Sequence, residues 1–199
     1  AYAAVLLYLL DDWRPHLYKT TDYGATWTRI SNGIPEDWPV HVVREDPVKP
    51  GLLFAGAEFG MFVSNDDGAN WHPFQQNLPA TPITDMVIHR GDLEISTMGR
   101  RFWIVDTITP LRQDGPRVPS PRVHLYRPQN AWRVRWNMNT DTPLPPEEPA
   151  GENPPEGAIL NYVLAAPALS VLVEVIDAGG RVVRRYTSEE KIEPPRDEG

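Results

Sequence analysis

The amino-acid sequence predicts an all-β fold built from repeated antiparallel sheets, and three observations support this prediction. Two copies of one eight-residue pattern begin at residues 20 and 64, so they lie 44 positions apart. The 22 prolines and 14 glycines among 199 residues indicate many turns and short elements. Short runs of β-branched and aromatic residues lie between these turns. A repeat of this period is typical of β-propeller blades, each a four-stranded antiparallel sheet.

The expected strands fall into three consecutive groups. The first group covers 3–10, 17–20 and 27–30, which we interpret as the later part of a blade. The second covers 40–44, 52–55, 61–64 and 71–74, which make one complete blade. The third covers 83–89, 93–97 and 102–106, followed at 106–110 by a decayed copy of the repeated pattern. The related segments 32–35 and 77–79 follow the outer strands of the first two groups, which supports a true repeat.

The remaining residues predict a change of domain after residue 136. Residues 137–157 are rich in proline and glutamate, which indicates an extended linker after a partial propeller at 1–136. Strands are expected at 158–164, 171–177 and 182–187, with a hairpin turn at 178–180. We interpret 158–188 as the start of an immunoglobulin-like β-sandwich and the polar residues 189–199 as a disordered tail.

The repeated pattern, here named the first box (20–27) and the second box (64–71), has a structural explanation for each recurring residue. The aspartates can accept hydrogen bonds from turn amides, and the glycines permit positive φ. The tryptophans are expected to pack under the turn or between sheets. The recurring residues are Thr20, Asp22, Gly24 and Trp27 in the first box, and Ser64, Asp66, Gly68 and Trp71 in the second.

Composition excludes several classes of function. The net charge of -8 and the absence of a basic stripe argue against nucleic acid as a partner. The chain has no cysteine, which removes thiolate nucleophiles and cysteine-based metal sites. The apolar segment 1–10 is too short to span a bilayer and has no basic region of the kind that begins a signal peptide. No cofactor is predicted.

Several longer segments resemble one bacterial family, the sortilin-like propellers with bacterial neuraminidase repeats, also called aspartate boxes and often labelled glycosyl hydrolases. The segments are LFAGAEFGMFVS at 53–64, GRRFWIVD at 99–106, ITPLRQ at 108–113, VHLYRP at 123–128 and GENPP at 151–155. The resemblance covers nearly the whole chain. One departure is Met98, where relatives often carry histidine.

The resemblance implies a long secreted or periplasmic bacterial protein. This chain would be a fragment holding its last blades, about two and a half to three, and the opening of the β domain that follows. The remaining blades of the parent chain are then its first expected partner. The hydrolase label of the family rests largely on the boxes, which also occur in non-catalytic receptors.

Candidate catalytic groups are few. A glycosidase needs two facing carboxylates, and only Asp85, at the start of an expected inner strand, and Glu58, in a turn, are candidates. A sialidase also needs an arginine cluster; Arg44, Arg100 and Arg101 are the arginines near the expected inner strands. Arg44 is expected to pair with Glu45 or Asp46 instead.

Candidate binding residues are Trp38, expected to be exposed, and Arg100 and Arg101 in a solvated turn. No metal site is predicted. The segment 65–68 superficially resembles a calcium loop, but Val63 and Phe74 stand where that loop needs acids, and the histidines lack zinc-ligand spacing. Two functions stay open. The favoured one is a platform that binds a protein, peptide or carbohydrate ligand; the alternative is a glycoside hydrolase, sialidase-like or polysaccharide-cleaving, in the full-length protein.

Overall fold

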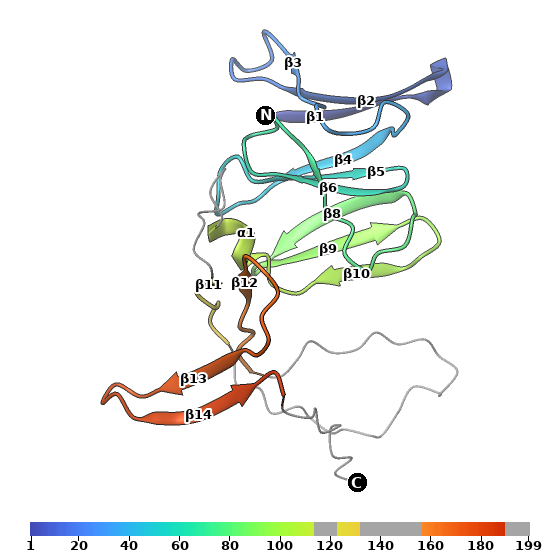
Figure 1. Cartoon of the computed structure of the whole chain (residues 1–199). Coiled ribbons are helices and arrows are strands. Elements are labelled where there is room, and N and C mark those ends of the chain that lie inside the picture. Colours follow the sequence, from blue (N-terminus) through green and yellow to red (C-terminus); the bar gives the residue numbers. More distant parts are fainter. Residues whose placement is uncertain (114–122, 132–156, 190–199) are drawn as a thin grey trace, which may run out of the picture. The chain divides into compact units, whose positions relative to one another are not determined.

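A computed structural model describes residues 1–113, 123–131 and 157–189 (Figure 1). The described part is all-β, as predicted, and consists of small antiparallel sheets. The chain divides into two compact units. The first contains three sheets and a short helix, and the second contains the strands near the C-terminal end.

The second sheet of the first unit is the most complete, with four strands in the order β4-β5-β6-β7. The strands are β4 (Val40–Glu45), β5 (Leu53–Ala57), β6 (Gly60–Ser64) and β7 (His72–Pro73). Every residue of β5 and β6 is buried, because these central strands carry apolar or small residues on both faces. The four strands predicted for this segment are confirmed as one antiparallel sheet, with the second box joining β6 to β7.

The first sheet has the order β1-β2-β3, from β1 (Tyr2–Leu7), β2 (Asp12–Lys19) and β3 (Thr28–Arg29). The first box follows β2 as the second box follows β6, so β1-β2-β3 correspond to β5-β6-β7. The predicted strand at 3–10 is too long. It ends at Leu7, and Tyr8–Leu10 form a 3₁₀ turn that closes on Asp11 in the left-handed conformation.

The third sheet has the order β10-β9-β8, from β8 (Ile83–His89), β9 (Asp92–Thr97) and β10 (Phe102–Val105). Where the box pattern has decayed, the structure has a short helix, α1 (Thr109–Gln113), that the sequence did not predict. One hydrogen bond of the boxes, from the first hydroxyl to the side chain two positions on, is also present in this decayed copy. The Thr107 hydroxyl donates to Thr109 Oγ1 at 2.9 Å, as the Thr20 hydroxyl donates to Asp22 in the first box.

The two faces of the second sheet form two apolar cores, one against each neighbouring sheet (Figure 1). The core with the first sheet includes Leu17, Val43, Phe62 and Trp71. The core with the third sheet includes Phe54, Met61, Ile83 and Leu93. Gly56 of β5 permits close approach to the third sheet, since a Cβ there would lie 2.5 Å from Ile83 Cγ2.

The second unit contains β12 (Tyr162–Leu164), β13 (Leu172–Ile176) and β14 (Val182–Thr187). The predicted hairpin at 171–187 is confirmed, because β13 pairs antiparallel with β14 through a turn at 177–181. The short strand β12 pairs with β11 (Val123–Leu125). The predicted linker at 137–157 and tail at 189–199 lie outside the described residues, except for Gly157 and Glu189.

Candidate functional site

The two boxes have the same hydrogen-bond geometry. Thr20 and Ser64 donate their hydroxyls to Asp22 and Asp66 at 2.8 Å, and each hydroxyl accepts the amide of the box glycine at 2.9 Å. Each aspartate also accepts the amide four positions on, at 2.9 Å. Gly24 and Gly68 have φ of 93° and 84°, as predicted. The box residues are thus engaged in holding their own turns.

The two box tryptophans differ in environment. Trp71 is 2% exposed; its indole N–H donates to the Ile30 carbonyl at 2.5 Å and its amide donates to Asn32 at 2.9 Å. Trp27 lies beside Gly24 of its own turn and is 47% exposed. Trp71 therefore packs between two sheets, whereas Trp27 lies only against its own turn, because no described sheet covers that side of the first sheet.

The box aspartates have lowered pKa values. The Thr26 hydroxyl, the Thr26 amide and the Thr20 hydroxyl lower the pKa of Asp22 from 3.8 to about 2. Burial alone would raise the pKa of Asp66, but hydrogen bonds from Asn70 and Ser64 outweigh it and the net direction is downward. Each ionised carboxylate therefore stabilises its turn.

We expect the first box to lose stability in acid. Because the folded-state pKa of Asp22 is lowered, its contribution is complete above the ordinary value of 3.8 and is lost as pH falls toward about 2. In Asp22→Asn the melting temperature should therefore fall less between pH 4 and pH 2 than in the wild type. The control is Asp11→Asn, which removes the same charge at a left-handed turn position that asparagine tolerates. An identical pH slope in wild type and Asp22→Asn would contradict the assignment.

A pocket lies at the other end of the second sheet, where a two-residue turn connects β5 to β6. Ala57 pairs with Gly60, which leaves Glu58 and Phe59 as the turn. The Glu58 amide donates to the Pro39 carbonyl at 3.0 Å and so ties the turn to the segment leading into β4. Gly60 leaves room for the Gln75 side chain, since a Cβ there would lie 2.0 Å from Gln75 Oε1.

Three aromatic rings form one side of this pocket. Trp38 packs edge-on against Phe59 and Phe62, with ring centroids 5.3 and 5.7 Å apart. The pocket has a volume of about 380 Å³ and an almost wholly apolar lining: Gly33, Pro35, Trp38, Phe59, Met61, Phe62, Pro73, Gln75, Leu78 and Ala80. The expectation for Trp38 needs correction, because its ring is half-buried and forms a wall of the pocket rather than standing free in solvent.

The polar groups nearest the pocket are already paired. Gln75 accepts from the Met61 amide and donates to the Leu78 and Pro79 carbonyls. The Glu58 carboxylate lies 2.8 Å from His41 Nε2. The predicted candidates Glu58 and Trp38 thus meet at one end of the sheet, with the carboxylate held by a histidine that the sequence did not single out as its partner.

Asp85, the other predicted carboxylate, lies on β8 beside a groove of about 280 Å³ lined by β1, β4 and β8. It accepts from Arg44 at 2.5 Å and from the Met86 amide at 2.7 Å. The expected pairing of Arg44 with Glu45 or Asp46 is therefore wrong. Arg44 crosses from β4 to the third sheet, where it also donates to the Met86 carbonyl at 2.9 Å.

Arg100 and Arg101 lie exposed in the turn between β9 and β10, as predicted. Neither guanidinium makes an ion pair within the described residues. Their carbonyls hold the turn: Arg100 accepts from the Trp103 indole at 2.7 Å, and Arg101 accepts from the Thr97 hydroxyl at 2.6 Å. Neither of them is among the described residues that line the Trp38 pocket.

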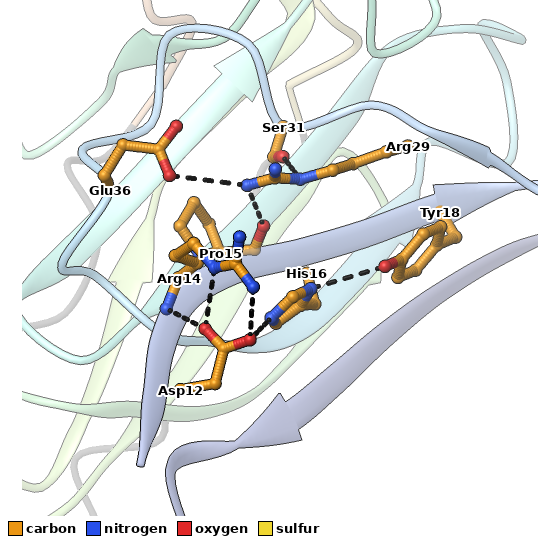
Figure 2. A network of polar contacts seen from close by, with 8 residues as sticks. All are labelled: Asp12, Arg14, Pro15, His16, Tyr18, Arg29, Ser31 and Glu36. Atoms are coloured by element: carbon orange, nitrogen blue, oxygen red, sulfur yellow. Dashed lines mark hydrogen bonds and ion pairs between the residues drawn. The ribbon is translucent and has the colours of Figure 1, made fainter. Parts of the chain in front are cut away.

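A polar network on one face of β2 was missed by sequence reasoning (Figure 2). The buried His16 ring lies between Asp12, at 3.0 Å, and the Tyr18 hydroxyl, at 3.3 Å. Arg14 donates to both oxygens of Asp12 and holds the pKa of that carboxyl well below its ordinary value. The sequence carries a signal for this network, because polar side chains recur at every second position from 12 to 18. Residues two apart in a strand lie on the same face of the sheet. Neither cavity described above opens onto the network.

The second missed interaction is a buried ion pair between the second sheet and α1. Asp46, whose side chain is 0% exposed, accepts from Arg112 Nε at 2.7 Å and from Nη2 at 2.9 Å. The Val48 amide also donates to Asp46, at 3.1 Å. This pair fixes the short helix, and no sequence signal connects two residues 66 positions apart.

Comparisons with known proteins add no assignment. No protein-family model matches the chain, and no curated protein matches it either. Within 1–113, 123–131 and 157–189, no three histidine or acidic side chains gather closely enough to hold a metal ion. Across the same ranges, no helix has the length and apolar character needed to cross a membrane.

Proposed function

We propose that this chain is part of a secreted aspartate-box β-propeller that binds a protein or peptide ligand through the Trp38 pocket. In this proposal the three sheets are successive blades near the end of the propeller. An immunoglobulin-like domain begins with the strands of the second unit. The two boxes with matching hydrogen bonds, 44 positions apart, support this interpretation of the fold.

The observation that carries the proposal is the nearly apolar lining of the pocket beside Trp38 and Phe59. A sugar carries hydroxyls that need donors and acceptors, whereas the Gln75 amide in this pocket is already hydrogen-bonded. A leucine, phenylalanine or proline side chain can instead be buried without polar partners. Burying one such side chain contributes about 1.5–3 kcal/mol.

The alternative, a glycoside hydrolase, receives less support. Both of its candidate carboxylates are already engaged, Asp85 in an ion pair with Arg44 and Glu58 in a hydrogen bond with His41. A general acid or nucleophile must instead face the substrate. The described residues therefore favour binding over catalysis.

A binding experiment separates the two functions. Screening the chain against an array of synthetic heptapeptides should select peptides with a large apolar residue. Trp38→Ala should weaken that binding at least about tenfold, because hot-spot aromatics typically contribute more than 1 kcal/mol. Trp38→Phe keeps the wall and should bind nearly as the wild type does. Trp13→Ala is the matched control, since Trp13 is an exposed tryptophan on β2 away from the pocket.

Two outcomes would overturn the proposal. One is equal peptide binding by wild type and Trp38→Ala. The other is hydrolysis of polysaccharides or sialosides that disappears in Asp85→Asn, which would assign the groove beside Asp85 to catalysis.

A further inference from the structure

The turn between β9 and β10 lies at the same end of the sheets as the β5–β6 turn beside the Trp38 pocket (Figure 1). Each turn is tied to the segment that enters its own sheet. The Glu58 amide donates to the Pro39 carbonyl, just before β4, at 3.0 Å. In the same way the Met98 amide donates to the Pro82 carbonyl, just before β8, at 3.0 Å. The β9–β10 turn is therefore the counterpart, in the third sheet, of the turn at the pocket.

One short segment joins the pocket to the β9–β10 turn. Ala80 lines the pocket, and the next residue, Thr81, donates its hydroxyl to the Met98 carbonyl at 3.2 Å. Arg100 and Arg101 follow Met98 in the same turn. Because consecutive Cα atoms lie about 3.8 Å apart, this path places the two arginines within roughly 20 Å of the pocket wall.

The two guanidinium groups of this turn are exposed and have no carboxylate partner within the described residues. Their main-chain carbonyls hold the turn, so its shape does not depend on the two charges. Other arginines of the first unit do have carboxylate partners, namely Arg14, Arg29, Arg44 and Arg112. On a chain with a net charge of -8, the β9–β10 turn is thus a local site of unneutralised positive charge.

A different wall of the pocket carries the opposite charge. Glu36 and Asp37 are exposed and directly precede Trp38 in the chain. The Glu36 carboxylate lies 3.6 Å from Arg29, whereas Asp37 has no ion pair in the described part of the chain. The pocket therefore has acids beside its Trp38 wall and arginines beyond its Ala80 wall.

We propose that the peptide bound by the Trp38 pocket carries acidic side chains on one flank of its apolar residue, and that these acids pair with Arg100 and Arg101. A guanidinium group binds a carboxylate through two parallel hydrogen bonds, and arginine clusters recognise acidic motifs in this way. An extended peptide advances about 3.3 Å per residue, so the acids lie within about six positions of the apolar residue. The acids beside Trp38 disfavour negative charge on the other flank. This inference rests on the proposed function, because it specifies the ligand of the same pocket.

The test compares labelled glycine–serine peptides that share a central phenylalanine, with binding measured by fluorescence anisotropy. One series carries two aspartates on the N-terminal or the C-terminal flank, at successive distances from the phenylalanine. The best of these should bind about threefold to tenfold more tightly than the same peptide with two asparagines, as expected for two exposed ion pairs. At about 1 M salt, where the Debye length is about 3 Å, this difference should disappear. Peptides with aspartates on both flanks should bind more weakly than those with aspartates on one flank.

Variants of the chain test the role of the two arginines. Arg100→Gln combined with Arg101→Gln should remove the preference for aspartate over asparagine. Charge reversal to glutamate at both positions should instead favour a peptide with two lysines. The matched control is Arg90→Gln in the turn between β8 and β9. Arg90 is also exposed and without an ion pair within the described ranges, and its φ of 51° resembles the 68° of Arg101.

The possible failures can be told apart. No binding of any phenylalanine peptide, or binding that Trp38→Ala leaves unchanged, would overturn the proposed function and this inference with it. Binding that requires Trp38 but does not distinguish aspartate from asparagine would overturn this inference alone, and so would an aspartate preference that survives the double glutamine variant. A melting temperature lowered in that variant but not in Arg90→Gln would show that the two arginines are engaged within the chain, which would also overturn it.

Discussion

Replacing Trp71 by alanine is expected to cost about 3–5 kcal/mol of unfolding free energy, the range found for buried aromatic truncations. The ring is 2% exposed and lies in the core between the first and second sheets. Its loss also leaves the Ile30 carbonyl without the indole donor at 2.5 Å. The expected effect therefore combines a cavity with an unsatisfied buried acceptor.

The first box supplies the matched control. Trp27 has the same place in the same motif but is 47% exposed, so Trp27→Ala should cost less than about 1.5 kcal/mol. Urea denaturation of the wild type and the two variants, followed by far-UV circular dichroism, measures the difference. Equal losses in both variants would show that the environment of Trp71 in the structure is wrong.

Replacing Arg112 by alanine is expected to cost about 3–5 kcal/mol, as for the breaking of other buried ion pairs. The Asp46 side chain is 0% exposed, and without Arg112 its carboxylate would stay buried with the Val48 amide as its remaining donor among the described contacts. The penalty is the cost of leaving one buried charge uncompensated, rather than the net attraction of the pair.

Two further variants test that explanation. Removing both charges with Asp46→Leu and Arg112→Met should recover most of the loss, because no unpaired buried charge remains. The exposed pair Arg44–Asp85 is the control, and Arg44→Ala should cost only about 0–1 kcal/mol. A loss in Arg112→Ala as small as that in Arg44→Ala, measured by the same denaturation, would contradict the burial of Asp46.

Local features of this fold could be predicted from the sequence. Strand alternation and turn residues placed β8 and β14 at their observed bounds. The spacing within the boxes predicted the roles of their aspartates and glycines, because these contacts lie within four residues. The sequence named Trp38 as a candidate binding residue but did not predict the pocket beside it. The other walls of that pocket come from turns far apart in the sequence.

Contacts between sheets could not be predicted in the same way. Arg44 donates to Asp85 rather than to its neighbours in sequence, because β4 and β8 lie side by side in the fold. The two residues are 41 positions apart along the chain, so no local pattern indicates the contact. The corresponding tryptophans of the two boxes, Trp27 and Trp71, have different burial because only Trp71 has a described sheet to cover it. A local pattern determines the turn, whereas the neighbouring sheet determines what that turn buries.

Gly56 limits how the second sheet can change without moving its neighbour. A Cβ at this position would meet Ile83 Cγ2 at 2.5 Å and Val42 Cγ1 at 2.8 Å, so even alanine would push the second and third sheets apart. The missing side chain at residue 56 thus sets the shortest distance at which these two sheets can pack, and any larger residue there would loosen the apolar core that they share.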